Sequence, residues 1–166
     1  IGGLLVKGDP AEQRRAIERA LEAGVTYFDT APLYGDGASE TNLGRAFSEM
    51  GGVPDSAIIG SKVRVDPAEV DRAPELIRAS VETSLRRLRV DHLPLIQLHT
   101  SITRARGRGV TASDALGPIL DGFRAVRDAG LVTHLGITAN GDTDAVREVV
   151  RSGAYATAQE IGRAHV

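Results

Sequence analysis

The chain alternates between short apolar runs and longer stretches in which apolar residues recur every three or four positions. The runs predict five short strands, at residues 25–28, 57–60, 93–98, 132–137 and 156–159. The stretches between them predict amphipathic helices, which begin at Pro10, about Ser39, Pro74, after Asp114, and at Asp142 or Thr143. This strict alternation indicates parallel βαβ units with short connections.

The first helix has the clearest start signal in the chain. Asp9 supplies an N-cap acid, Pro10 occupies the first helical position and Glu12 follows three residues after the cap. Gly24 then ends the helix directly before the first strand. The later units follow at nearly regular intervals, without a linker or a low-complexity segment. We therefore expect one α/β domain, built either as a doubly wound sheet or as a (β/α)8 barrel.

Polar side chains close each of the first four predicted strands. The segment TYFDTAPLYGDGASE (residues 26–40) passes from an apolar strand to Asp29 and Tyr34, while Lys62, His99 and Thr138 close the next three strands. Singly, each residue has an ordinary interpretation as a solvated strand end or, for Asp29, as the start of an Asx-type turn. Because the carboxyl ends of parallel strands gather on one face, we expect these side chains at a common mouth.

The residue types at this mouth suit the protonation of an oxygen atom. A lysine ammonium beside a tyrosine favours the phenolate form, so we expect Lys62 to make Tyr34 a usable general acid. Asp29 would keep Lys62 charged and oriented, and His99 would donate a hydrogen bond to a substrate oxygen. The set contains no credible nucleophile, which favours proton transfer over covalent catalysis.

The composition of the chain limits the kinds of binding partner that we expect. The chain has 166 residues, 42% hydrophobic content, a net charge of -2 and no cysteine. Zero cysteines exclude disulfides, thiolate zinc sites and cysteine nucleophiles. No apolar run reaches the length of a membrane helix and no signal-peptide pattern is present, so we expect a cytoplasmic protein without a membrane partner. The nearly balanced charge argues against nucleic acid as a partner.

Motifs for other chemistries are absent from the sequence. The Gly-Asp-Gly at residues 35–37 lacks the third glycine of a dinucleotide fingerprint. There is no P-loop, no G-x-S-x-G elbow and no H-E-x-x-H helix, and we expect no bound metal. Arg104, Arg106 and Arg108 follow the third strand and form a possible phosphate or nucleic-acid patch. Because no aromatic residues interleave them, we favour a flexible loop over the strand-end face.

The segments that carry these residues resemble the aldo/keto reductase family. FDTAPLYGDGASETNLGRAF resembles that family's second-strand signature, IIGSKV its lysine strand and LIQLHT its histidine strand. AGLVTHLGIT is similar to the segment that leads into its fifth strand, and the resemblance extends from about Asp9 to Gln159. It implies an incomplete (β/α)8 barrel with strands two to six present, an oxidoreductase, and a small-molecule carbonyl or alcohol as substrate.

The resemblance also implies a role for each residue at the mouth. Tyr34 would be the general acid, Lys62 and Asp29 its tuning pair, and His99 the group that orients the carbonyl. Hydride would come from a nicotinamide cofactor, usually NADP, with NAD as the second possibility. The reaction would reduce an aldehyde or ketone to an alcohol, or run in reverse.

Four residues are implied at the cofactor. Thr138, Asn140 and Gln159 would hold the nicotinamide amide, and Asp29 would also lie beside the cofactor. Ala139 stands where the family has an asparagine. Thr138 and Gln159 therefore transfer from the family pattern more directly than Asn140 does.

The resemblance sets expectations about the extent of the chain. A complete barrel needs about 250 residues, so we expect residues 1–159 to be part of a barrel domain. The final IGRAHV is the translation of a common sequencing-adapter string, so we expect residues 160–166 to be non-native and give His165 no role. An unclosed barrel leaves two open sheet edges, and we expect the chain as written to be unstable and inactive.

Two functions follow from this interpretation. The first is an enzyme, a nicotinamide-dependent carbonyl reductase or alcohol dehydrogenase. The alternative is a regulatory subunit that keeps the barrel and the bound nucleotide but has little turnover. The intact set of Asp29, Tyr34, Lys62 and His99 favours the enzyme.

Overall fold

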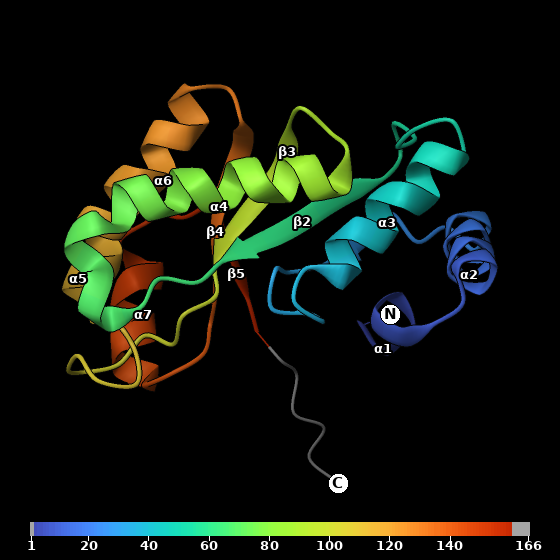
Figure 1. The fold of residues 1–166 in the computed structure, drawn as a ribbon. Helices are drawn as coiled ribbons and strands as arrows, with labels where there is room; N and C mark the ends of the chain where they lie inside the picture. Colours follow the sequence, from blue (N-terminus) through green and yellow to red (C-terminus); the bar gives the residue numbers. More distant parts are fainter. Residues whose placement is uncertain (1, 161–166) are drawn as a thin grey trace, which may run out of the picture.

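The computed structural model describes residues 2–160, so the expectation for the last residues, 161–166, lies outside the described part. Its five strands confirm the predicted elements with small shifts at their ends (Figure 1). They are β1 (Tyr27–Asp29), β2 (Ile58–Val63), β3 (Leu93–Leu98), β4 (Val132–Thr138) and β5 (Thr157–Gln159).

Helices precede and connect the strands. They are α1 (Gly2–Lys7), α2 (Pro10–Glu22), α3 (Ala38–Glu49), the 3-10 helix η1 (Pro67–Arg72), α4 (Ala73–Leu88), α5 (Ala112–Leu116), α6 (Pro118–Asp128) and α7 (Thr143–Arg151). The predicted start of α2 is confirmed, because the Asp9 side chain accepts hydrogen bonds from the backbone N–H groups of Ala11 and Glu12. Within residues 2–160, no helix combines the length and the apolarity needed to span a membrane.

All five strands are parallel and lie side by side in their sequence order, β1-β2-β3-β4-β5. The register pairs Asp29 with Gly60, Lys62 with Gln97, and Thr138 with Gln159. A doubly wound sheet would reverse its strand order at a switch point, and the strands within residues 2–160 show no reversal. The sheet is therefore half of a (β/α)8 barrel, which decides between the two architectures that the sequence left open.

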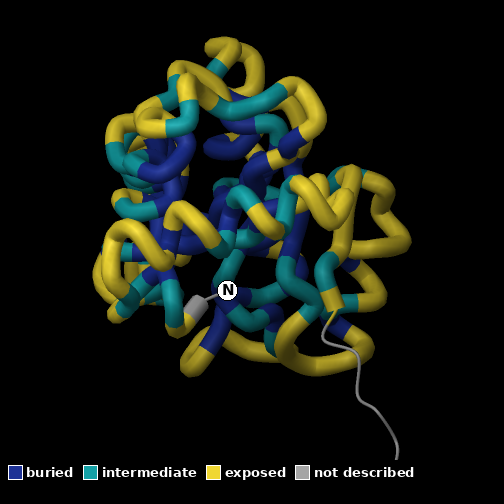
Figure 2. The backbone as a smooth tube through the Cα atoms, turned by 90° about the vertical axis from the view of Figure 1, so that its right-hand side faces the viewer, coloured by how far each residue is buried: buried dark blue, intermediate teal, exposed yellow. Residues whose placement is uncertain are grey.

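The two faces of the curved sheet differ in chemistry. The outer face carries apolar side chains such as Phe28, Ile59 and Ile96, which are buried in one core with the surrounding helices. Helices α4 and α6 pack against β2 and β4 on this face. Figure 2 shows the buried stretches gathered inside the molecule and the exposed ones along its outline. The inner face carries most of the polar side chains of the strands, and Tyr27 and Ile58 there remain 40% and 45% exposed.

Strand β2 extends further than its apolar run predicts. The apolar run predicts an end at residue 60, with Lys62 just beyond it, whereas Lys62 lies inside the strand, as the resemblance of IIGSKV implies, and is 1% exposed. The polar pair Ser61 and Lys62 hid the continuation, because apolar periodicity does not detect a strand whose polar side chains are buried. Lys62 is therefore a core position and not a solvated strand end.

The segment between β3 and α6 is more ordered than the expected flexible loop. It contains α5, whose N-cap Thr111 and Asp114 form a capping box. Arg106 pairs with Asp114 at 2.6 Å and Arg104 pairs with Asp144 at 2.8 Å. Ile102 is fully buried. It forms isolated β-bridges to a residue later in the same segment and to a residue in the loop after β4. Two of the three arginines thus form ion pairs that help to hold the segment in place.

The packing of α3 on α4 gives the first prediction. A Cβ atom at Gly44 would overlap the backbone carbonyls of Arg87 and Leu88, whereas a Cβ at Gly3 would meet nothing within 4 Å. In the full-length protein, we expect Gly44→Ala to lower the free energy of unfolding by about 1–3 kcal/mol through overpacking. The control, Gly3→Ala in helix α1, should leave it unchanged or raise it by up to about 1 kcal/mol. Urea titration measures both, and equal effects would contradict this view of the interface.

Candidate active site

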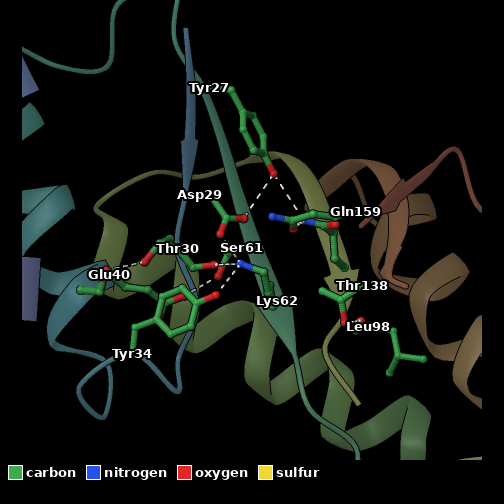
Figure 3. A network of polar contacts seen from close by, with 12 residues as sticks. Tyr27, Asp29, Thr30, Tyr34, Glu40, Ser61, Lys62, Leu98, Thr138 and Gln159 are labelled. Carbon is green, nitrogen blue, oxygen red and sulfur yellow. Dashed lines mark hydrogen bonds and ion pairs between the residues drawn. The ribbon is translucent and has the colours of Figure 1, made fainter. Parts of the chain in front are cut away.

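Lys62 joins Asp29 and Tyr34, two of the side chains that the sequence predicts at the strand ends (Figure 3). Its ammonium group donates to Asp29 Oδ2 at 2.7 Å, to the Thr30 carbonyl at 2.9 Å and to the Tyr34 hydroxyl at 3.2 Å. It also lies 4.8 Å from the centre of the Tyr34 ring. The three hydrogens of an ammonium group therefore each have an acceptor, which offsets the cost of burying the charge.

The loop from Thr30 to Gly37 brings Tyr34 back toward Lys62. Hydrogen bonds from Gly37 N–H to the Pro32 carbonyl and from the Ser39 N–H to the Tyr34 carbonyl close it. Residues 35–37 of the loop all have positive φ, at 66°, 51° and 83°. Glycine adopts this conformation most easily, and two of the three residues are glycines. The Gly-Asp-Gly that fails as a nucleotide fingerprint is thus the turn that leads into α3.

Glu40 fixes the start of α3 below this loop. Its carboxylate is fully buried, accepts a hydrogen bond from the Ser61 hydroxyl at 2.6 Å and pairs with Arg87 at 3.3 Å. The Thr30 and Ser39 hydroxyls are also hydrogen bonded to each other, at 2.9 Å. Glu40 therefore attaches the end of the loop to β2 and α4, and the Thr30–Ser39 bond holds the two ends of the loop together, which keeps Tyr34 in place.

His99 follows β3 and faces Tyr34. The two rings meet edge to face, with centroids 5.9 Å apart and planes at 90°. Burial first, and then the positive charge of Lys62, hold the pKa of His99 below its ordinary value, while Asp29 acts in the opposite direction. His99 is therefore neutral near neutral pH and carries one ring N–H. Its Nδ1 is buried without a hydrogen-bond partner among the described residues.

A cavity of about 620 Å³ opens beside these groups. Its lining includes six of the seven predicted site residues, namely Tyr34, Lys62, His99, Thr138, Asn140 and Gln159. The seventh, Asp29, lies behind Lys62 and instead borders the neighbouring hollow at the edge of β1, together with Tyr34. The structure thus brings the predicted strand-end residues together, with Asp29 set back from the cavity.

The three residues expected at a cofactor amide differ in how they are held. The Thr138 hydroxyl donates to the Leu98 carbonyl at 3.1 Å, which leaves its oxygen free to accept. Asn140 donates from its side-chain amide to the Ser101 hydroxyl at 3.0 Å. The Gln159 Oε1 accepts from Gln97 Nε2 at 3.0 Å.

Two inner-face residues near the site were missed by the sequence analysis. Tyr27 stands two positions before Asp29 and Gln97 two positions before His99, so each shares the face of a predicted site residue. Tyr27 was counted only as part of an apolar run, and Gln97 only as part of a strand. A period of two counted back from Asp29 and His99 is the signal that identifies both.

The fold and the site together define a class, the (β/α)8-barrel proteins whose polar site lies at the carboxyl ends of the strands. The chain belongs to the aldo/keto reductase family, whose sequence model matches residues 2–161. It is 32% identical over 146 residues to aldo-keto reductase YhdN of Bacillus subtilis. The aligned segment covers 83% of this chain and 40% of the relative.

Solved structures agree. The holo form of an aldo-keto reductase from Bacillus halodurans superposes with a TM-score of 0.75 at 25% identity and covers 96% of this chain and 51% of that one. An aldo/keto reductase from Klebsiella pneumoniae in complex with NADP and acetate gives a TM-score of 0.70 at 25% identity, over 90% of this chain and 47% of that one. The chain thus spans about half the length of the relatives it matches.

The electrostatics of His99 give the second prediction. Lys62→Met removes a nearby positive charge, so the pKa of His99 should rise, whereas Asp29→Asn removes a negative charge and should lower it. Histidine proton NMR of the full-length protein over a pH series measures both changes. The control variant Lys7→Met changes an exposed lysine on α1 and should leave the His99 titration in place. Shifts of the same sign in both site variants would contradict the assignment of causes.

Proposed function

We propose that the whole protein reduces an aldehyde or ketone to an alcohol, or catalyses the reverse, with NADPH or NADH as hydride donor. The observation that carries the proposal is the Lys62 ammonium group, which bridges Asp29 Oδ2 and the Tyr34 hydroxyl at the wall of a cavity that His99 also lines. A buried charge with three acceptors, one of them a phenol facing a cavity, has little structural use and suits proton transfer.

Tyr34 is the proposed general acid. Its hydroxyl gives a proton to the carbonyl oxygen as that oxygen becomes an alcohol, and Lys62, 3.2 Å away, stabilises the phenolate that remains. Asp29 and the Thr30 carbonyl hold the ammonium group in this position. Because these contacts fix the ammonium group and the phenol relative to each other, little reorganisation of the two groups is needed during the reaction.

His99 is the proposed orienting group. As a neutral imidazole it has one N–H to donate, and the edge-to-face packing on Tyr34 fixes its ring beside the phenol. A carbonyl oxygen within reach of both the Tyr34 hydroxyl and the His99 ring would accept two hydrogen bonds. This arrangement holds the oxygen where charge develops and selects for a carbonyl over an apolar group.

The residues that line the cavity fit a nicotinamide amide. Thr138 presents an oxygen that is free to accept, and Gln159 presents an amide nitrogen whose partner oxygen is already bonded to Gln97. We propose that Thr138, Asn140 and Gln159 hold this amide. We propose that Asp29 instead holds the Lys62 ammonium group in place. When bound, the nicotinamide supplies the hydride. The NADP found in the Klebsiella pneumoniae relative supports this choice of cofactor.

The proposal concerns the whole protein because the described part is half of a barrel. Tyr27 and Ile58 are exposed on the inner face, which a closed barrel would cover. We therefore propose that residues 1–159 form part of a complete (β/α)8 domain, and that the activity requires the strands that close it.

The role of Tyr34 gives the third prediction. In the full-length protein, Tyr34→Phe should lower kcat for aldehyde reduction by about 10²- to 10⁴-fold, because the proton donor is lost. The dissociation constant of NADPH, followed by its fluorescence, should stay nearly unchanged. Tyr155→Phe is the matched control: its hydroxyl donates to the Ala115 carbonyl, away from the cavity, so this variant should keep its activity.

Two outcomes would contradict this function. Full reduction by the Tyr34→Phe variant would remove Tyr34 from the proposed role. A wild-type protein that binds NADPH but reduces no aldehyde or ketone in a panel would favour the regulatory, nucleotide-binding alternative.

A further inference from the structure

A chain of hydrogen bonds crosses the inner face of the sheet and connects the ion pair to Gln159 (Figure 3). Gln97 Nε2, on β3, lies 3.0 Å from Gln159 Oε1 on β5 and 3.3 Å from the Tyr27 hydroxyl on β1. The Tyr27 hydroxyl in turn lies 3.5 Å from Asp29 Oδ1. The function proposed above assigns no role of its own to Tyr27 or Gln97.

Two strand glycines make room for this chain. A Cβ atom at Gly60, on β2, would overlap the Tyr27 hydroxyl. A Cβ at Gly136, on β4, would overlap the Thr157 hydroxyl and approach Gln97 Cγ to 3.1 Å. Neither glycine has a positive φ, so both are explained by space and not by backbone conformation. Gln97 itself is 1% exposed. The chain is therefore a built feature of the inner face.

The charge of Asp29 sets the direction of every bond in the chain. A carboxylate can only accept, and Lys62 already occupies Oδ2, so Tyr27 donates to Oδ1. Burial and the nearby Asp29 charge raise the pKa of Tyr27 to about 12, which keeps its proton in place. Having donated, the Tyr27 oxygen accepts from Gln97. The same Gln97 nitrogen then donates its second hydrogen to Gln159 Oε1.

The orientation of Gln159 follows from this order. Its oxygen is bonded to Gln97, which leaves its Nε2 with two hydrogens to donate. Gln159 lines the same cavity as Tyr34 and His99. The ligand atom that Gln159 can bind is therefore an acceptor, such as the carbonyl oxygen of a carboxamide.

We propose that Tyr27 and Gln97 are positioning residues that fix the Gln159 amide, so that its nitrogen donates to the nicotinamide carboxamide. The inference rests on the proposed function, because it needs a nicotinamide in this cavity. Tyr27 and Gln97 act only through Gln159, and neither touches the cofactor itself.

The test compares two ligands of the full-length protein, NADPH and 2′-phospho-ADP-ribose, which lacks the nicotinamide. Tyr27→Phe removes the acceptor that holds the Gln97 amide and Gln97→Leu removes the donor to Gln159, both with little change in side-chain volume. Each should raise the dissociation constant of NADPH about 3- to 10-fold. The dissociation constant of 2′-phospho-ADP-ribose should not change. Calorimetry measures both constants, and their ratio separates a positioning role from a general loss of structure.

Two controls sharpen the comparison. Gln13→Leu makes the same change at another buried glutamine, which bonds the Leu4 and Gly8 carbonyls near α1. It should lower stability but leave the ratio of the two constants unchanged. In a Gln159→Leu background, Gln97→Leu should have no further effect on NADPH binding, because its proposed target is gone.

Failure of this inference is distinguishable from failure of the proposed function. If both variants change the two dissociation constants equally, or change neither, while Tyr34→Phe still abolishes reduction, the positioning role is wrong and the function stands. If the wild-type protein binds 2′-phospho-ADP-ribose and NADPH equally tightly and reduces no carbonyl compound, both proposals are wrong.

Discussion

The burial of the Lys62 charge is the constraint on which the rest of the site depends. An ammonium group that leaves water without partners costs several kcal/mol. Here Asp29, the Thr30 carbonyl and the Tyr34 hydroxyl each accept one of its hydrogens. Removing any of these acceptors leaves part of the charge unsatisfied, so the positions of β1, β2 and the loop that follows β1 are coupled through one nitrogen atom.

The parallel register is what makes this coupling possible. Asp29 pairs with Gly60, so Lys62 lies one inner-face position further along β2, level with the start of the loop that carries Tyr34. A slip of one residue would turn Lys62 to the outer face, among the apolar residues that pack under the helices. The buried polar contacts of Glu40 with Ser61 and Arg87 work against such a slip. The same contacts therefore serve the fold and the site.

The sequence predicts the strand-end residues well because, in a parallel sheet, residues at the ends of neighbouring strands lie close together even when they are far apart in the sequence. Once alternating strands and helices are recognised, Asp29, Lys62 and His99 must approach one another, whichever α/β architecture forms. Periodicity cannot predict which face of a strand is polar when both faces are buried, which explains the misplaced end of β2. The contact of Gln97 with Tyr27 and Gln159 joins β3 to β1 and β5, and no local pattern encodes a contact across three strands. Thr111 and Asp114 did carry a signal, the capping box of α5, that the polarity of the segment obscured.

The two faces of the sheet have different roles: side chains on the outer face mainly pack in the core, and side chains on the inner face mainly form the site. On β3, Ile96 and Leu98 lie fully buried in the core with the helices, while Gln97 between them faces the polar interior. Packing alone would favour an apolar residue at position 97 and a side chain at Gly60. The Gln97 oxygen has no hydrogen-bond partner among the described residues, and an unsatisfied amide and a strand glycine both cost stability. Both costs fall on inner-face positions along the path from Asp29 to Gln159. An inner face that gives up packing along one continuous polar path is better explained by a requirement to orient groups at the mouth than by a requirement to fold.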